Sequence, residues 1–393
     1  MGRRREEVKQ SFLDAYGNEP EVFRAPGRIN IIGEHTDYND GFVLPAAIDL
    51  SVYIFIQKNG SNQCNLVSID LDDTYSFQLK ESLVPVEKGW VNYFLGVIDQ
   101  LQLAGHTIEG FDLMFTSDIP IGSGLSSSAA LECGFGMALN ELFDLKIEKQ
   151  DLAKIGQVAE HKFAGVKCGI MDQFASCMGK SNHVIQLDCR SLNFEYFPAD
   201  FKDYDLVLFD SNVKHNLADS QYNIRRSQCE EGVRAIQKIK PSVHSLRDTT
   251  LHDLNAVKAD IDEVVYRRCK YVIEENIRVQ QVCAALQEGD ILNVGAIMSQ
   301  THEGLKSDYE VSCKELDVLI DIASNCKGHI GGRMMGGGFG GCTINLIERS
   351  QVDQVIEQVT EEYKAITGID TKIYQVKIAD GIGSYKEIIQ DEI

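Results

Sequence analysis

The chain has 393 residues, 44% of them hydrophobic and 25% charged, which is the composition of a globular protein with two or three domains or two large lobes. Its formal net charge of −21 repels phosphate polymers, so we expect no nucleic-acid partner. The 11 cysteines include no Cys-x-x-Cys pair and no apolar run reaches transmembrane length, so we expect neither a disulfide framework nor a membrane partner.

The predicted elements interleave helices and strands along the chain. Residues 3–16 have helical spacing, and strand patterns follow at 21–31, 51–57 and 65–70. A helix is predicted over 93–103, a strand over 111–117, and helices over 125–143 and 152–165. Strands at 184–188 and 205–210 precede long helices over 219–327, and a strand, a helix and a strand follow at 343–347, 351–367 and 372–377. Because the alternation is not strict, α+β lobes with mixed sheets are favoured over a doubly wound parallel sheet.

The segment GRINIIGEHTDY at residues 27–38 places charged side chains beside an apolar strand. Arg28 stands inside the strand pattern, and Glu34, His35 and Asp37 follow its end. Burying one of these groups without a partner costs several kcal/mol, roughly. The segment therefore predicts either that these groups pair with one another or that they bind a polar ligand.

A second motif, PIGSGLSSSAALE at residues 120–132, runs from a strand through glycines and serines into a helix. Glycines allow close backbone approach, and a helix N-terminus offers free N–H groups and a partial positive charge. The motif predicts a site for a di- or triphosphate, although a serine-capped helix is the simpler alternative. A P-loop is excluded because Phe174 replaces its first glycine before Gly179-Lys180-Ser181, and Ser127 weakens a dinucleotide fingerprint.

Two further segments carry chemistry. GGRMMGGGFGGC at residues 331–342 is too rich in glycine for a helix or an ordinary strand interior, so we expect a tight loop whose backbone approaches a ligand closely, rather than a flexible linker. In CGIMDQF at residues 168–174, Asp172 sits among apolar residues and is either a carboxylate base or a helix N-cap. Glu160 ends a helical pattern and, taken alone, is more often a solvated residue on a helix face than a functional carboxylate.

Together these motifs resemble those of the GHMP small-molecule kinases and, within them, the galactokinases. The segments EHKFAGVKCGIMDQF and SQYNIRRSQCEEG are also similar to galactokinase segments in the same order, and the resemblance spans residues 20–378. It implies a two-lobed α+β fold, with an N-terminal lobe at 1–195, a C-terminal lobe at 196–393 and the active site between them. The implied reaction is ATP-dependent phosphorylation of the anomeric C1 hydroxyl of α-D-galactose to galactose 1-phosphate and ADP, the first committed step of galactose catabolism by the Leloir pathway.

The resemblance also implies roles for individual residues. Asp172 is the implied catalytic base, and Arg28 assists it by keeping the carboxylate ionised. The implied galactose-binding residues are Glu34, His35, Thr36, Asp37, Gly169 and Tyr222. The implied ATP-binding residues are Ser68, Gly122, Ser123, Gly124, Leu125, Ser126, Ser127 and Ser128. The implied Mg²⁺ ligands are Ser128 and Glu160.

Three alternatives stay open at this point. A kinase for N-acetylgalactosamine or for arabinose would share much of the pattern, and a galactose sensor without catalysis would lack the Ser128-Ala129 pair that is present here.

Met335 stands where galactokinases carry Thr, so a hydroxyl is missing beside the third motif. The arginines near the N-terminus precede charged residues rather than an apolar segment, so we expect no signal peptide and a cytoplasmic enzyme. The sequence leaves the oligomeric state unknown, and we favour a monomer.

Overall fold

The two longest strands of the N-terminal sheet lie side by side within it. The computed structural model describes residues 2–80, 82–120, 122–214 and 218–385. β1 (Glu21–Asn30) and β3 (Pro45–Lys58) belong to a six-stranded sheet of order β13-β1-β3-β6-β4-β5. Its other strands are β4 (Gln63–Ser68), β5 (Asp73–Gln78), β6 (Phe111–Ser117) and β13 (Gly383–Ser384). β4 and β6 run parallel whereas the other neighbours are antiparallel, which confirms the predicted mixed sheet.

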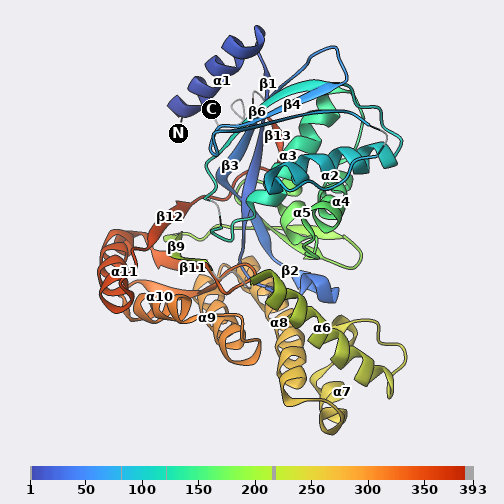
Figure 1. The fold of residues 1–393 in the computed structure, drawn as a ribbon. Helices are drawn as coiled ribbons and strands as arrows, with labels where there is room; N and C mark the ends of the chain where they lie inside the picture. Colours follow the sequence, from blue (N-terminus) through green and yellow to red (C-terminus); the bar gives the residue numbers. More distant parts are fainter. Residues whose placement is uncertain (1, 81, 121, 215–217, 386–393) are drawn as a thin grey trace.

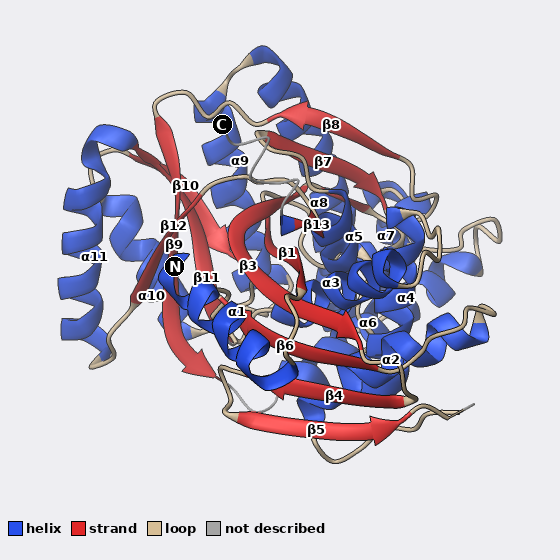
Figure 2. Ribbon diagram, turned by 90° about the horizontal axis from the view of Figure 1, so that it is seen from above, coloured by secondary structure: helices blue, strands red, loops and turns tan. Residues whose placement is uncertain are grey.

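Both faces of this sheet are covered. Alternate residues of β3 point to opposite faces: Ile54 lies in the main core, and Tyr53 and Phe55 pack against α1 (Gly2–Tyr16). Figure 2 shows α1 lying across the strands. The helices on the main-core side are α2 (Gly89–Leu103), α3 (Ser127–Leu142), α4 (Lys149–Ala159) and α5 (Met171–Met178). α3 packs on β1 and β3, which brings its N-terminus close to Arg28.

The C-terminal half contains a four-stranded antiparallel sheet of order β10-β11-β9-β12. Its strands are β9 (Tyr204–Lys214), β10 (His329–Met334), β11 (Gly340–Glu348) and β12 (Lys372–Val376). α10 (Lys314–Asn325) and α11 (Val352–Thr367) pack on it through a separate apolar cluster, and α9 (Ile291–Glu303) packs on β10. α6 (Ala218–Gln237), α7 (Leu251–Ala256) and α8 (Glu263–Glu288) form the end of the molecule opposite α1 (Figure 1).

Smaller elements join the two halves. β2 (Phe42–Val43), β7 (His183–Asp188) and β8 (Phe194–Pro198) form a third sheet. The short helical turns are η1 (Asp37–Asn39), η2 (Glu160–Ala164), η3 (Leu246–Asp248), η4 (Lys258–Asp260), η5 (Gly304–Asp308) and η6 (Arg349–Gln351).

One apolar core includes residues of both halves, and β13, near the end of the chain, pairs with β1. The lobe boundary between residues 195 and 196 stays a prediction. No helix in the described part of the chain is long and apolar enough to span a membrane.

The structure corrects the sequence-based interpretation of the third motif. Gly331 and Gly332 lie inside β10 rather than in a loop, and only the middle of the motif forms the turn between β10 and β11. A Cβ atom on Gly331 would stand 1.9 Å from the carbonyl oxygen of Gly295 in α9. Gly331 is therefore needed for close packing of α9 against β10, a requirement that lies in the tertiary contact.

Candidate active site

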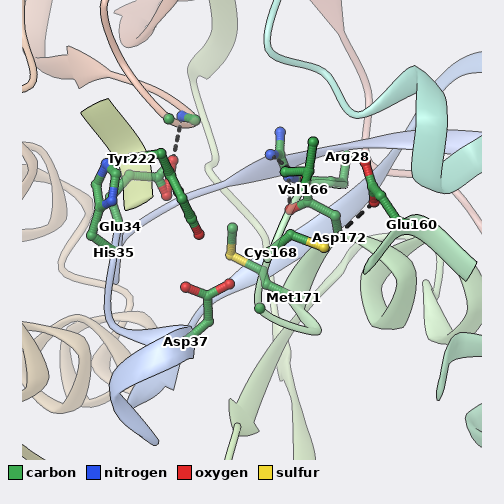
Figure 3. A pocket seen from close by; sticks show the side chains of 13 residues that line it. Arg28, Glu34, His35, Asp37, Glu160, Val166, Cys168, Met171, Asp172 and Tyr222 are labelled. Carbon is green, nitrogen blue, oxygen red and sulfur yellow. Dashed lines mark hydrogen bonds and ion pairs between the residues drawn. The ribbon is translucent and has the colours of Figure 1, made fainter. Parts of the chain in front are cut away.

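A cavity of about 190 Å³ lies where the two halves meet. Figure 3 shows Arg28, Asp172 and Glu160 on one side of it and Glu34, His35, Asp37 and Tyr222 on the other. Its complete lining is Arg28, Glu34, His35, Asp37, Glu160, Val166, Cys168, Gly169, Met171, Asp172, Tyr222, Gly336 and Gly337. The cavity is smaller than the pockets that hold drug-sized ligands, and charged groups dominate its polar lining, so it suits a small, highly polar molecule.

Arg28 and Asp172 form the catalytic side of the cavity. The buried Arg28 donates through Nε to Asp172 Oδ1 at 2.7 Å and through Nη2 to Oδ2 at 2.9 Å. Burial lowers the pKa of Arg28, but the carboxylates of Asp172, Glu34 and Asp37 together outweigh it, so the pKa stays above its ordinary value. This bidentate pair fixes the orientation of Asp172 in the first turn of α5.

Asp172 has a second anchor in the serine loop. Ser126, held at a φ of +60°, directs its hydroxyl to Asp172 Oδ2 instead of capping α3. Gly124 accepts a hydrogen bond from Arg28 through its carbonyl oxygen. The Asp172 side chain nevertheless stays 28% exposed, so a ligand in the cavity can reach it.

Glu34 is nearly fully buried on the opposite side of the cavity. Its carboxylate accepts hydrogen bonds from the Asn30 amide and from the backbone N–H of Gly336, and Arg333 Nη1 lies 3.6 Å away. Arg333 is itself fully buried, and its guanidinium also bonds to backbone carbonyls at the end of β1. Glu34 is therefore held in place as a hydrogen-bond acceptor by contacts from both halves of the chain.

Asp37 and Gly169 meet at the floor of the cavity. A Cβ atom on Gly169 would stand 1.8 Å from Asp37 Oδ2, so only glycine fits there while the carboxylate keeps its place. Burial raises the pKa of Asp37 from 3.8 to about 7, and the charge of Asp172 adds to the effect. Hydroxyl donors from a ligand would stabilise the charged form of Asp37.

His35 and Tyr222 form an aromatic wall, with their ring centroids 5.4 Å apart. Burial lowers the pKa of His35 to about 3, with a contribution from Arg225, so the imidazole is neutral near pH 7. Burial also raises the pKa of Tyr222, as does Asp37, which leaves its phenol protonated. The His35 Nε2 atom is buried and has no hydrogen-bond partner within the described part of the chain, so it is available to bond to a ligand.

Glu160 lines the cavity, and Ser128, in the first turn of α3, lines the larger cavity next to it. The Ser128 hydroxyl donates to Glu160 Oε1 at 3.1 Å, and Gln173 Nε2 donates to Glu160 Oε2 at 2.7 Å and to Glu132 Oε2 at 3.3 Å. Burial raises the pKa of Glu160, and so does the charge of Asp172. Burial likewise raises the pKa of Glu132, together with the charge of Glu160. A cation would relieve this accumulation of buried carboxylates.

Mg²⁺ fits this position. In an octahedral Mg²⁺ site, oxygens at 2.0–2.1 Å from the metal are about 3 Å from their neighbours. The Ser128 and Glu160 oxygens, 3.1 Å apart, match that spacing. The described part of the chain holds no cluster of three or more His, Cys, Asp or Glu side chains for a metal, and Mg²⁺ usually completes its shell with phosphates and water.

A larger cavity of about 710 Å³ lies next to the serine loop. Its walls include Ser127 and Ser128 on one side and Trp90 and Phe115 on the other. The Ser68 hydroxyl is buried there and finds no hydrogen-bond partner among the described residues. An apolar chamber with one orphaned hydroxyl, opening beside a helix N-terminus, suits a nucleotide whose base is buried and whose phosphates meet the loop.

Other residues of the sequence-based assignment have structural contacts. The Thr36 hydroxyl donates to the backbone carbonyls of Gly33 and Phe42, and the Ser123 hydroxyl donates to that of Pro120. Leu125 is in the core, and its carbonyl accepts from the Arg28 backbone N–H. Gly122 and Gly124 supply positive φ angles of 78° and 76° to the loop.

The structure adds residues that sequence reasoning missed. Glu132 and Gln173 support Glu160, although both belong to motifs already singled out. Their polar side chains inside apolar runs are the signal that could have identified them. Met335, which stands where galactokinases carry Thr, packs its side chain into the core, so this chain places no hydroxyl at that position.

Comparison with known families places three matches along the chain. The galactokinase galactose-binding signature matches residues 10–58, the GHMP kinase N-terminal domain matches 92–180 and the GHMP kinase C-terminal domain matches 283–365. The first match contains Arg28 and Glu34, the second contains Ser128 and Asp172, and the third contains the glycine-rich turn.

Full-length relatives agree with these matches. The chain is 39% identical over 378 residues to a galactokinase of Roseiflexus sp. and 40% identical over 379 residues to one of Clostridium beijerinckii, with at least 95% of each chain covered. It superposes on the crystal structure of Lactococcus lactis galactokinase complexed with galactose with a TM-score of 0.93 and 34% identity, covering 96% of this chain and 99% of that one. Methanococcus jannaschii mevalonate kinase, at 19% identity and a TM-score of 0.65, shares the fold over 92% of this chain and 99% of its own.

Proposed function

The chain belongs to the galactokinase family of the GHMP kinases, and on that premise we propose how its residues divide the work. As a galactokinase it transfers the terminal phosphoryl group of ATP to galactose. The product of transfer to the anomeric C1 hydroxyl of α-D-galactose is galactose 1-phosphate, with ADP released. The larger cavity beside the serine loop holds the nucleotide, and the smaller cavity holds the sugar.

The sugar is held by groups that differ in charge and hydrogen-bonding capacity. Glu34 and Asp37 accept hydrogen bonds from its hydroxyls, and His35 and Tyr222, which form the aromatic wall, also make hydrogen bonds to them. Gly169 leaves the space beside Asp37 open. A hydrogen bond with one charged partner contributes about 1.5–3 kcal/mol net. Epimers of galactose are rejected because a misplaced hydroxyl would leave buried groups unpaired.

Asp172 is the general base for phosphoryl transfer. It accepts the proton of the C1 hydroxyl as that oxygen bonds to the terminal phosphorus of ATP and the bond to the ADP oxygen breaks. Arg28 keeps the carboxylate charged and oriented, and Ser126 holds one of its oxygens. The first turn of α3 directs its N–H groups toward the phosphates.

Ser128 and Glu160 hold Mg²⁺ in this proposal. When bound, the ion neutralises phosphate charge during transfer. Gln173 and Glu132 keep the Glu160 carboxylate turned toward Ser128. Their role is to present the two protein oxygens at the spacing that the ion requires.

The arrangement of Arg28, Asp172 and Glu160 around one cavity, with Ser128 bonded to Glu160 from the neighbouring larger cavity, supports this proposal most strongly. A coupled assay of ADP release against galactose, N-acetylgalactosamine and arabinose tests it. Galactose is expected to give the highest kcat/KM. A higher value for another sugar would reassign the substrate, and galactose binding without ADP release would support a sensor instead.

Two properties complete the proposal. We propose that the enzyme acts in the cytoplasm, where ATP is available, and that it is a monomer. Sedimentation at several protein concentrations tests the second point, because a monomer keeps one sedimentation coefficient throughout.

A further inference from the structure

A buried chain of hydrogen bonds leads away from His35 on the side opposite the cavity. His35 Nδ1 lies 2.8 Å from the Tyr38 hydroxyl, which lies 2.7 Å from the Tyr309 hydroxyl, which in turn lies 3.3 Å from Cys229 Sγ. Tyr309 and Cys229 are fully buried and Tyr38 is partly buried, so water is excluded from the bond between Tyr309 and Cys229 and has limited access to the other two. The chain joins the end of the first motif to α6 and to the residue after η5.

Each hydroxyl in this chain has one proton, so the bonds run in one of two directions. If they run toward Cys229, the sulfur must accept the last bond, and sulfur is a weak acceptor. The Asn39 amide already interacts with that sulfur. If they run toward His35, the thiol donates to Tyr309, Tyr309 donates to Tyr38, and Tyr38 donates to an imidazole nitrogen. Bonds that run toward His35 end at an imidazole nitrogen, which is a better acceptor than the sulfur of Cys229.

The direction of the chain decides what His35 presents to the cavity. A neutral imidazole that accepts at Nδ1 carries its proton on Nε2. Among the residues that the structure describes, Nε2 has no hydrogen-bond partner although it is buried. We propose that Tyr309 and Tyr38 hold His35 as its Nε2–H tautomer, so that His35 donates a hydrogen bond to a galactose hydroxyl. The assignment of galactose to this cavity rests on the proposed function, whereas the tautomer is a property of the protein alone.

This arrangement gives the sugar site a donor that complements its carboxylates. Glu34 and Asp37 are acceptors when charged, and His35 would supply a donor beside them. Tyr38 and Tyr309 are then positioning residues, since they touch His35 and each other rather than the reacting atoms. The site can distinguish an axial from an equatorial hydroxyl, because only one orientation lets the hydroxyl oxygen accept from His35 while its proton is donated to a carboxylate.

The tautomer can be read directly from ¹⁵N NMR of the full chain labelled at its nine histidines. The His35 signals are identified by their loss in His35→Ala or, if that variant does not fold, by their change on adding galactose. The expected spectrum has a protonated, pyrrole-type Nε2 and an unprotonated Nδ1. A protonated Nδ1 in the wild-type chain would overturn the proposal.

Tyrosine variants test the chain of bonds. Tyr38→Phe should lose the pure tautomer signature and raise the KM for galactose about tenfold, while kcat changes by less than about twofold. Tyr309→Phe should weaken the signature, because nothing then donates to the Tyr38 hydroxyl, which can either donate to His35 or accept from it. Tyr196→Phe, which removes a 2.6 Å bond to the Met178 carbonyl outside the cavity, is the matched control and should change neither quantity. An unchanged tautomer in Tyr38→Phe would contradict the proposal.

Sugar analogues separate this proposal from the proposed function. Deoxygalactoses identify the hydroxyl that bonds to His35, because removing that hydroxyl no longer weakens binding in His35→Ala. A fluorine at the same position can accept a hydrogen bond but cannot donate one. The fluoro analogue should therefore bind the wild-type chain better than the deoxy analogue, and equal weakening would argue against a donor. If galactose itself neither binds nor reacts, the proposed function fails, and the NMR measurement still decides the tautomer.

Discussion

Replacing Asp172 by Asn changes little in shape and removes the proton acceptor from the cavity. Arg28 donates to both oxygens of Asp172, at 2.7 and 2.9 Å, whereas an asparagine offers one oxygen and turns an NH₂ group toward the other donor. Breaking a buried pair costs about 3–5 kcal/mol, and we expect about 1–3 kcal/mol here because the Asp172 side chain is 28% exposed. The variant should therefore fold with a lower melting temperature.

The chemical effect should be larger than the structural one. A general base contributes about 10²–10⁴-fold, or roughly 3–5 kcal/mol of barrier, so kcat should fall by that factor. Galactose should still bind, because Glu34, Asp37 and His35 remain. The charge of Asp172 also contributes to the raised pKa of Asp37, so the variant should lower that pKa and shift the pH dependence of galactose binding toward acid.

The assay compares kcat, galactose affinity by calorimetry and thermal stability in the same preparations. Asp188→Asn is the matched control, since Asp188 accepts two bonds from Arg247, at 3.0 and 3.1 Å, away from both cavities. It should lower the melting temperature and leave kcat unchanged. Turnover of Asp172→Asn within tenfold of wild type would refute the assignment, and an equal loss of kcat in both variants would show that the pair is only structural.

Three further changes test the other parts of the site. Asp37→Asn should abolish tight galactose binding and stabilise the fold. The unfolded chain loses its Asp37 proton near pH 3.8 and the folded chain near pH 7, so the wild type loses stability as the pH rises between these values. The melting temperatures of the two proteins should therefore coincide at pH 4, and that of the variant should be higher at pH 8. Ser128→Ala should raise the apparent KM for Mg²⁺ about tenfold or more and weaken Mn²⁺ binding measured by spin resonance, and unaltered Mn²⁺ affinity would remove Ser128 from the metal site. Gly169→Ala should lower kcat/KM for galactose by roughly 10²-fold with little effect on the KM for ATP, because its Cβ atom displaces the Asp37 carboxylate.

Much of the fold could be predicted from local patterns. The long strands β1, β3 and β6 and the helices α1 and α11 follow hydrophobic periodicity, and the structure confirms them. The glycines of β10 could not be placed this way, because Gly331 is required by the backbone of α9, an element about 35 residues earlier in the chain.

The same contrast holds for the site. Local sequence determined which residues carry its chemistry: Arg28 and the acidic cluster after β1, the serines at a helix N-terminus, and Asp172 in an apolar segment. Only the tertiary structure decided how they act. It placed Asp172 against an arginine 144 residues away and connected His35 through Tyr38 to Tyr309, 271 residues further along the chain. Charge and hydrogen-bonding capacity belong to a side chain and can be read from its type, whereas burial, pKa and proton position depend on neighbours that only folding brings together.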